Sequence, residues 1–576
     1  MTGSGTLLDP YVIWDVDDLQ DMNFDLTAYY ELGQNIDALP AKWGWASQIR
    51  RPTGDFFSAG AWNVFPAAPA TKWDKIDEVV ADGDATYIEG VTNGADADFT
   101  FPAFAVPATA ENIGLKLTAI VRNDGTGTSR LRFRLRVNGV NYVKLKSSFT
   151  SSAYVQFKGV WNENPDTGLP WTVNDINGVG PSPLQAIGVE AFDATPDLRI
   201  TQFYATAFSM GFEPIGQDTG APADRFSGYF DGKEFTISNL LINRPEGYKC
   251  VGLFGINQIW TSGYLRNVGL ENVDITGEGN VGSLIGFAEY MTLLADGIIS
   301  DVWATGIVRG EDVLIGGFTG YNGSLIQDCW TSCEVIILGE VTHARQNGGF
   351  VGLNDRVIRR CYATGNITVN HQTGRDIEEI GGFVGYHNNQ EIDQCFSTGD
   401  VLINDDGMAL DDVWAIGGFC GDNWGNGIRN CYARGNVTVT AGTGIAEDVG
   451  GLCGWSESPV VNCYSTGSVS APGFATVGGL VGQNWGSVVT DSFWDTNTSG
   501  MLISDGGTGL PTAQMKDSDT FITAGWGFGA EWGMTGVCND GYPCLLGVTP
   551  SCAWAPVVPP PPYRVNRAYA LAREEL

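Results

Sequence analysis

The chain has 576 residues, more than the roughly 100–200 residues of one domain, so we expect several domains. Lysine and arginine number 32 against 66 aspartates and glutamates, and the net charge of −34 argues against nucleic acid or an anionic membrane as a partner. Only 17% of residues are charged, 43% are hydrophobic and 78 are glycine, which indicates a folded, Gly-rich, all-β protein instead of a disordered acidic tail.

The first residues show neither the basic nor the apolar region of a signal peptide, and no apolar run is long enough to span a bilayer. We therefore expect a protein that is assembled inside a cell and is not inserted into a membrane. Residues 1–39 resemble the capping helix and first strand that commonly open β-helices. Asp15 is the expected N-cap of the helix, with Asp18 three residues later.

Residues 40–210 follow a different pattern of short alternating strands, such as LKLTAIV, LRFRLRVNG, YVQFKGVW and IGVEAF, which predicts a β-sandwich. One of these strands alternates four arginines with apolar residues and so places four guanidinium groups on one exposed face: Arg130, Arg132, Arg134 and Arg136. This basic face is expected either to meet an acidic neighbour or to remain solvated. With DATYIEG (84–90) and NPDTGLPWTVNDING (164–178), the segment resembles a jelly-roll module of tailed-phage virion proteins.

Residues 211–513 contain an internal repeat that decides the fold. From Val251 onward eight related blocks occur, among them IGGFTGYN, NGGFVGLN, IGGFVGYH and VGGLVGQN. Their closing glycines are separated by 28–36 residues, which is typical of a solenoid: Gly255, Gly286, Gly320, Gly352, Gly385, Gly421, Gly454 and Gly482.

Most of these motifs are followed by a second repeated block, such as RCYATG, QCFSTG or NCYSTG. In the first of them Cys361, Ala363 and Ile367 alternate with Tyr362 and Thr364, a period of two that predicts a strand. Such strands can bury their apolar face by stacking as a parallel β-helix with coils about 4.8 Å apart. From about residue 251 to 546 the motifs resemble the GLUG-repeat family, a resemblance that implies a β-helical surface or adhesin protein.

The cysteines of these blocks are expected to form one inward column, with Val302 and Ser492 as its flanking members: Cys329, Cys361, Cys395, Cys431 and Cys463. Cys420 and Cys453 form a second column. Valine, serine or threonine occupies the same positions in other coils, so we expect reduced, buried, unreactive thiols. Cys538, Cys544 and Cys552 lie outside these columns and could include one disulfide.

An aromatic residue follows each column position and is expected on the outer face: Trp303, Trp330, Tyr362, Phe396, Tyr432, Tyr464 and Phe493. Three roles are open for this aromatic stripe. It could stack sugar rings, cover an interface between protomers, or form a ladder that only stabilises the sheet.

Residues 514–556, with WGF, EWG and GYPCL, resemble the closing cap of such β-helices. Residues 557–576 predict a stiff Pro-rich spacer and a short helical tail with three arginines, Arg564, Arg567 and Arg573. The tail is expected either to dock onto another subunit or to be a frayed terminus.

No constellation for catalysis is apparent, and no metal site is expected. His343, His371 and His387 lie between repeat blocks without a two-ligand spacing, which argues against a zinc site or a serine triad. Carboxylates are paired at Asp405 with Asp406, Asp411 with Asp412, and Glu378 with Glu379, all expected in loops. A solvated surface is the simple interpretation of these pairs, and a catalytic pair or a calcium site is the alternative. No cofactor is expected apart from a structural calcium ion.

These patterns favour a non-enzymatic, virion-borne attachment protein, similar to a tail fibre or spike, that binds a host cell-surface glycan or envelope component. The alternatives are an architectural component of a virion or an extracellular surface, and a glycan-degrading spike enzyme. The expected location is the virion surface or tail, or otherwise the cell surface. Other virion or surface proteins and further copies of this chain, in a homo-oligomer such as a trimer, are the expected protein partners.

Overall fold

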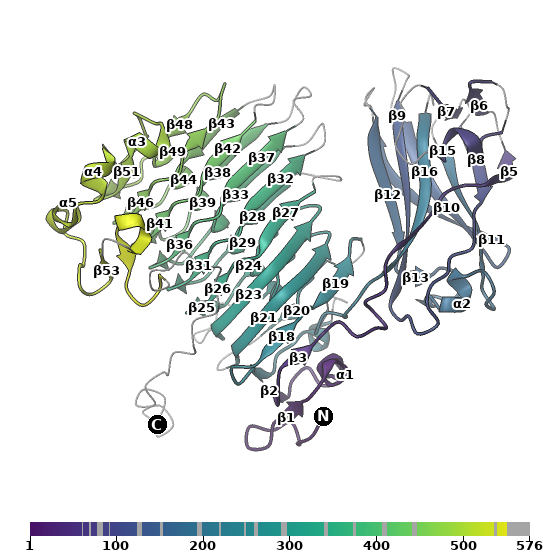
Figure 1. The fold of residues 1–576 in the computed structure, drawn as a ribbon, viewed down its shortest axis with the longest axis horizontal. Helices are drawn as coiled ribbons and strands as arrows, with labels where there is room; N and C mark the ends of the chain where they lie inside the picture. The colour runs from purple at the N-terminus through teal and green to yellow at the C-terminus, as the bar shows by residue number, and fades with distance from the viewer. Residues whose placement is uncertain are drawn as a thin grey trace.

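The structure is a computed structural model of the whole chain. It describes residues 1–59, 62–67, 71–77, 85–90, 93–123, 129–149, 154–192, 198–217, 221–246, 249–258, 263–289, 297–338, 344–371, 376–405, 412–440, 446–534 and 538–549. Figure 1 shows a long β-helix beside a β-sandwich, which confirms the predicted all-β fold with an inserted sandwich. None of the helices in the described residues has the length and hydropathy needed to cross a bilayer.

Three parallel sheets form the walls of the β-helix, and the coils from β28 onward add one strand or a short group of strands to each wall. One wall has eight strands: β20 (Phe254–Asn257), β22 (Ile285–Ala288), β24 (Thr319–Asn322), β29 (Val351–Asn354), β34 (Val384–His387), β39 (Cys420–Asn423), β44 (Cys453–Ser456) and β49 (Val481–Asn484). The second wall has five: β28 (Ala344–Gly348), β33 (Ile377–Gly381), β38 (Val413–Gly417), β43 (Ala446–Gly450) and β48 (Val477–Gly478).

The third wall is the longest sheet and begins with the strands of the N-terminal coils: β1 (Tyr11–Ile13), β2 (Tyr29–Leu32), β3 (Ile36–Asp37), β17 (Tyr229–Asp231), β18 (Thr236–Ser238), β19 (Leu241–Arg244), β21 (Tyr264–Gly277) and β23 (Ile298–Gly310). It continues as short segments in each later coil: β25 (Leu325–Gln327), β26 (Trp330–Thr331), β27 (Glu334–Ile337), β30 (Ile358–Arg359), β31 (Tyr362–Ala363), β32 (Ile367–His371), β35 (Ile392–Asp393), β36 (Phe396–Ser397), β37 (Val401–Asp405), β40 (Ile428–Arg429), β41 (Tyr432–Ala433), β42 (Val437–Val439), β45 (Val460–Val461), β46 (Tyr464–Ser465), β47 (Val469–Ser470), β50 (Val489–Thr490), β51 (Phe493–Asp495) and β52 (Thr508–Leu510).

A left-handed residue separates the first two segments of this wall in each of the later coils. It stands directly before the column cysteine, as at Arg360 (φ 52°), Asn430 (φ 48°) and Asn462 (φ 54°). Asparagine and aspartate tolerate this conformation better than most residues, which explains why they recur before the cysteine in the sequence.

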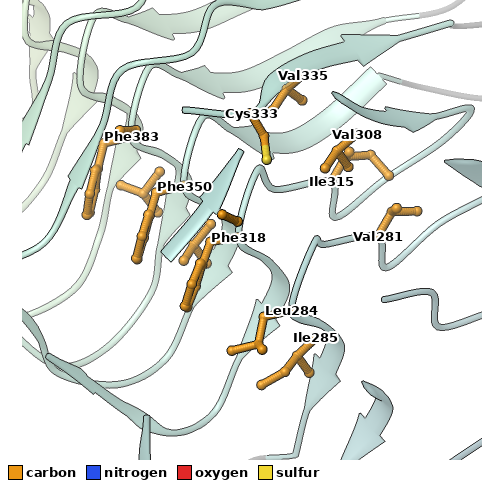
Figure 2. Packing of buried hydrophobic residues seen from close by; sticks show 14 of the residues in the cluster. Val281, Leu284, Ile285, Val308, Ile315, Phe318, Cys333, Val335, Phe350 and Phe383 are labelled. Carbon is orange, nitrogen blue, oxygen red and sulfur yellow. The ribbon is translucent and has the colours of Figure 1, made fainter. Parts of the chain in front are cut away.

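The interior consists of columns of identical or similar side chains. The rings of Phe318, Phe350, Phe383 and Phe419 stack at centroid separations of 4.7–4.8 Å, and Figure 2 shows the first three beside Leu284 and Ile285. The predicted cysteine column is confirmed, because its five thiols are at most 1% exposed and the strands that follow them are in register.

The cysteines are buried free thiols wherever their side chains are described, and Cys544 is one of them. The Cys538 side chain and the whole of Cys552 lie outside the part of the chain that the structure describes. The possible disulfide among the three C-terminal cysteines therefore also lies outside it. Burial raises the pKa of Cys333 to about 12, and burial also holds the pKa of Cys329 well above its usual range. Both effects keep these two thiols protonated at neutral pH.

The chain leaves the β-helix after β3 to form the sandwich, and it has returned by Ile215, which bridges to Phe254 of β20. The two sides of this insertion pair with each other, since Ile36 lies in register with Ile237 and Tyr29 with Tyr229. The predicted capping helix is α1 (Val16–Gln20), in which the Asp15 side chain accepts a hydrogen bond from the Asp18 amide at 2.9 Å.

Two antiparallel sheets form the sandwich around a hydrophobic core of its own. One sheet contains β5 (Gly54–Ala59), β8 (Ala95–Thr100), β15 (Leu184–Phe192), β10 (Ser129–Val137) and β11 (Val140–Phe149). The other contains β6 (Trp62–Phe65), β7 (Tyr87–Gly90), β16 (Leu198–Ser209), β9 (Ile113–Asn123) and β12 (Val155–Trp161), with β4 (Gln48–Arg50) paired to β16. The small helix α2 (Val173–Ile176) closes one end.

Glu246 makes polar contacts between the β-helix and the sandwich. Its carboxylate accepts from the Val160 amide at 3.0 Å and lies 2.9 Å from the Lys144 ammonium. Each body buries most of its apolar surface within itself, because the two hydrophobic cores are separate clusters.

We expect residues 40–210 to fold when expressed alone, because their core does not depend on the β-helix. The measurement is thermal unfolding followed by near-ultraviolet circular dichroism, in which a cooperative transition is expected. A soluble product with no cooperative transition would contradict the prediction.

We expect Gly435→Ala to lower the free energy of unfolding by about 1–3 kcal/mol, because the new methyl group overpacks the contact between coils. A Cβ atom at Gly435 would lie 1.8 Å from the carbonyl oxygen of Gly399 on the neighbouring coil. Urea denaturation measures the change. Gly44→Ala is the control, since the nearest atom to its Cβ would be at an ordinary 3.6 Å, and equal losses in both variants would contradict the prediction.

Candidate functional site

The aromatic stripe is a continuous ladder on the outside of the third wall. Neighbouring rings from Trp303 to Tyr464 stack with centroids 4.7–5.7 Å apart and planes within 11° of parallel. The side chains from Trp330 to Phe493 are nevertheless buried, with at most 9% of their surface exposed. The structure therefore corrects the expectation that the stripe lies open on the outer face, because these side chains are covered.

The cover over the stripe is the C-terminal segment of the same chain. The segment contains α3 (Thr496–Ser499), α4 (Thr512–Met515), α5 (Ser518–Thr523), β53 (Trp532–Gly533) and β54 (Cys544–Leu545). It packs Phe521, Trp526 and Trp532 against the ladder. The Tyr464 hydroxyl donates to the carbonyl of Pro543 at 2.6 Å, and Figure 1 shows the segment beside β36 and β41. Among the three roles left open, the structure shows a stabilising ladder, covered by this chain itself.

The four arginines of β10 do not form an open basic face. Arg134 is only 8% exposed, and its guanidinium lies 2.6 Å from Asp96 and 2.9 Å from Asp98. Arg132 lies 3.1 Å from Glu190 and over the ring of Phe192. Arg136 donates to Asn141, while Arg130 is exposed. Of the two expectations for this face, an acidic neighbour holds for Arg132 and Arg134, and the acidic residues belong to β8 and β15 of the sandwich itself.

The other predicted residues fall into two groups. Arg564, Arg567, Arg573, His343, Asp406 and Asp411 lie outside the described residues, as do the side chains of His371 and Asp405. His387 lies inside β34, not in a loop, and burial lowers its pKa to about 4, so the ring is neutral. Glu378 and Glu379 lie in β33, again not in a loop, and they belong to the site described next.

A patch of tryptophans and carboxylates lies on the outside of the β-helix, where the eight-stranded and five-stranded walls meet. We call it the tryptophan–carboxylate patch. It consists of Arg345, Glu378, Glu379, Tyr386, Trp414, Asp422, Glu447, Asp448, Trp455, Glu457 and Trp485.

Strand register explains how these residues come together. Along the eight-stranded wall, Tyr386, Asp422 and Trp455 occupy the same outward position in successive coils. Along the five-stranded wall, Glu378, Trp414 and Glu447 do the same. The next residue in each of these strands has a left-handed backbone, and in two of them it is a carboxylate: Glu379 with φ 57° and Asp448 with φ 64°. This conformation acts like a β-bulge and turns a second consecutive carboxylate away from the core.

The tryptophans of the patch form a contiguous aromatic surface across three coils. Trp414 and Trp455 meet edge to face with centroids 6.4 Å apart, and Trp455 and Trp485 lie 5.8 Å apart. Trp485 is 65% exposed, an unusual position for so large an aromatic ring. The Trp455 indole donates to Glu457 at 3.2 Å, and the Trp414 indole donates to Glu378. These hydrogen bonds fix the orientation of two of the three rings.

Three carboxylates in the patch are buried, and two of them, Asp422 and Asp448, have an oxygen without a hydrogen-bond partner among the described residues. Asp422 is 5% exposed and its Oδ1 is unpartnered; Asp448 is 1% exposed and its Oδ2 is unpartnered. Burial, together with the nearby charges of Glu379 and Glu457, raises the pKa of Asp422 to about 8. Burial raises the pKa of Asp448 to about 6, despite a hydrogen bond from Thr476.

Glu379 differs from these two because it is ion-paired. The Arg345 guanidinium donates to both of its carboxylate oxygens, at 3.0 and 3.1 Å, and also lies 3.2 Å from Glu378. The patch therefore combines buried carboxyl groups, an ion-paired carboxylate and flat aromatic surface, a set of groups that suits a polyhydroxylated ligand. Among the described residues, no three or more His, Cys, Asp or Glu side chains are arranged to hold a metal ion.

Comparison with known proteins finds similarity over limited parts of the chain. Residues 412–440 match the model of the GLUG motif. A Gly-rich membrane protein of Evansella cellulosilytica is 43% identical over 101 residues, or 17% of this chain. Halomucin of Haloquadratum walsbyi is 40% identical over 114 residues, or 20% of this chain. The matches span 11% and 1% of the length of these two relatives. The chain is thus a β-helical protein that carries the GLUG motif.

Solved structures with a similar chain course include carbohydrate-related domains. The xylan-binding domain CBM22-1 of Paenibacillus barcinonensis Xyn10C is 15% identical, with a TM-score of 0.18, and covers 28% of this chain and 97% of its own. The catalytic unit of a GH87 α-1,3-glucanase from Streptomyces thermodiastaticus is 12% identical, with a TM-score of 0.18, and covers 82% and 97%. These TM-scores are too low to carry a functional conclusion.

We expect Asp422→Asn to remove a pH dependence of stability. Above its ordinary pKa of 3.8 the unfolded chain loses this proton, whereas the folded protein keeps it until about pH 8. The free energy of unfolding therefore falls as pH rises from about 4 to about 8 and then levels off. The variant should flatten this fall and be more stable at pH 9 by roughly 1–4 kcal/mol. Urea denaturation across this pH range is the measurement.

The matched control is Glu334→Gln, an exposed carboxylate on the third wall. It should leave the slope of stability against pH unchanged. A slope that survives in Asp422→Asn would show that Asp422 is ionised in the folded protein at neutral pH.

Proposed function

We propose that this protein is a non-enzymatic, surface-exposed glycan-binding protein and that a sugar chain lies on the tryptophan–carboxylate patch. The observation that carries the proposal is the contact of Trp414, Trp455 and Trp485 beside carboxylates on one outer face. The apolar C–H faces of pyranose rings stack on indole rings, and carboxylates accept hydrogen bonds from sugar hydroxyl groups.

The repeated architecture favours an extended ligand. Successive coils present Tyr386, Asp422 and Trp455 at one outward position, so an oligosaccharide that runs along the axis would meet a new side chain on each coil. Several weak contacts along one rigid face can give useful affinity without a deep cavity.

The proposal includes the location of the protein. The similarity to a Gly-rich membrane protein and to halomucin supports a cell-surface or extracellular location. A virion tail fibre or spike is the more specific setting that the sequence favours. Immunogold labelling of native cells and of purified particles separates the two, because the label should appear on only one of them.

We expect Trp455→Ala to weaken glycan binding about 10-fold or more, because it removes the central ring of the aromatic surface. The measurement is co-sedimentation with insoluble polysaccharides, followed by titration calorimetry with the best oligosaccharide. Trp14→Ala is the matched control, since Trp14 is also exposed but follows β1 in the N-terminal coil. Equal glycan binding by Trp455→Ala, Trp14→Ala and the parent chain would show that the patch is not the binding site.

The same samples test the enzymatic alternative. Size-exclusion chromatography of a soluble polysaccharide after incubation should show an unchanged chain length. Progressive shortening that is abolished by Asp422→Asn would instead identify the patch as the active site of a glycan-degrading enzyme.

A further inference from the structure

The carboxylates of the patch lie beside the tryptophans themselves. Glu447 is in register with Trp414 on the neighbouring strand, and Glu457 accepts the hydrogen bond from the Trp455 indole. A sugar ring stacked on either indole would therefore place its substituents next to an acidic side chain. The only cation of the patch is Arg345, whose guanidinium is held by Glu378 and Glu379.

Asp422 and Asp448 give an independent indication that a polar ligand group belongs here. Both side chains are at least 95% buried, yet each retains a carboxyl oxygen that meets no donor or acceptor among the described residues. Burying such an oxygen without a partner costs free energy, and a ligand that supplies the missing hydrogen bond recovers it. Asp422 lies between Tyr386 and Trp455 in its outward column, so the unpartnered oxygen belongs to the patch.

The negative charge of the patch limits which class of glycan it can bind. Carboxylate or sulfate groups on a sugar would be repelled by Glu447, Glu457 and the net charge of −34. A neutral sugar would satisfy the indoles but would leave the carboxylates without a charged partner. An ammonium group supplies up to three N–H donors and the opposite charge.

We propose that the tryptophan–carboxylate patch selects glycans that carry free amino groups, as in polymers that contain glucosamine, over neutral and anionic glycans. This inference rests on the proposed function, because it names the substrate class of the same site. Indole rings bind the pyranose faces, while Glu447 and Glu457 hold the ammonium groups at the ring edges.

The test uses the full chain and three probes of equal length: a glucosamine hexamer, an N-acetylglucosamine hexamer and a galacturonate hexamer. Calorimetry at low salt should show about 10-fold tighter binding of the glucosamine hexamer than of its acetylated form. The galacturonate hexamer should not bind. Raising the salt concentration should reduce the preference for the glucosamine hexamer, because salt screens the half-buried carboxylates Glu447 and Glu457.

Variants separate a specific site from general attraction to an acidic protein. Glu447→Gln should reduce binding of the glucosamine hexamer about 3-fold to 10-fold and leave the N-acetylglucosamine hexamer unaffected. Glu334→Gln, the same change on the exposed part of the third wall, should alter neither. Glucosamine binding that is equally strong in Trp455→Ala and Glu447→Gln would show general attraction and overturn the inference.

Two outcomes distinguish this inference from the proposal on which it rests. Equal or tighter binding of the N-acetylglucosamine hexamer would overturn the selectivity for amino groups and leave glycan binding intact. Binding of no glycan of any charge, in a screen that includes neutral polysaccharides, would overturn both.

Discussion

In-register stacking of the coils is the constraint on which the rest of the structure depends. Each backbone strand approaches the next so closely that a Cβ atom at Gly399 or Gly435 would meet a carbonyl oxygen 1.8 Å away. The glycine repeats are therefore required by contact between coils. Because equivalent residues then occupy one column, each kind of side chain must be compatible with a copy of itself on the neighbouring coil.

The interior columns follow from this constraint. Phenylalanine rings stack on phenylalanine rings, thiols lie beside thiols, and asparagines donate to asparagines, as Asn322 does to Asn354 at 2.8 Å. A charged group could not repeat in this way inside the solenoid, since like charges would face each other at the distance between coils. Variation is tolerated on the outer positions, and the tryptophan–carboxylate patch has formed there. Its coils replace Tyr321 and Leu353 of earlier coils with Asp422 and Trp455.

The aromatic stripe shows how a repeated surface can become part of the core. Its rings are apolar and regularly spaced, so they can bind any flat apolar partner, and the C-terminal segment supplies one. Tyr432 and Tyr464 are fully buried by this segment although they lie on the outside of the β-helix. The exposed tryptophans lie on another face, where the described residues include no such cover over Trp485.

The sequence by itself determined the fold of the coils, because the spacing of the glycine motifs and the alternation of inward and outward residues are local properties. The alternation of Cys361 and Tyr362 places them on opposite faces, and the repeated glycines specify how the coils stack. It also placed the sandwich between residues 40 and 210 by a change of pattern. The outward positions that carry Trp414, Asp422 and Trp455 could have been found by aligning the blocks and asking which position varies. Only the tertiary structure decided which surfaces are open, because burial of the stripe depends on distant residues such as Thr549, which is 117 positions from its partner Tyr432. The same applies to Arg134, whose charge is neutralised by Asp96 and Asp98 across the sheet. Long-range contacts of this kind leave no periodic signal in the chain, and they decided where a ligand can reach this protein.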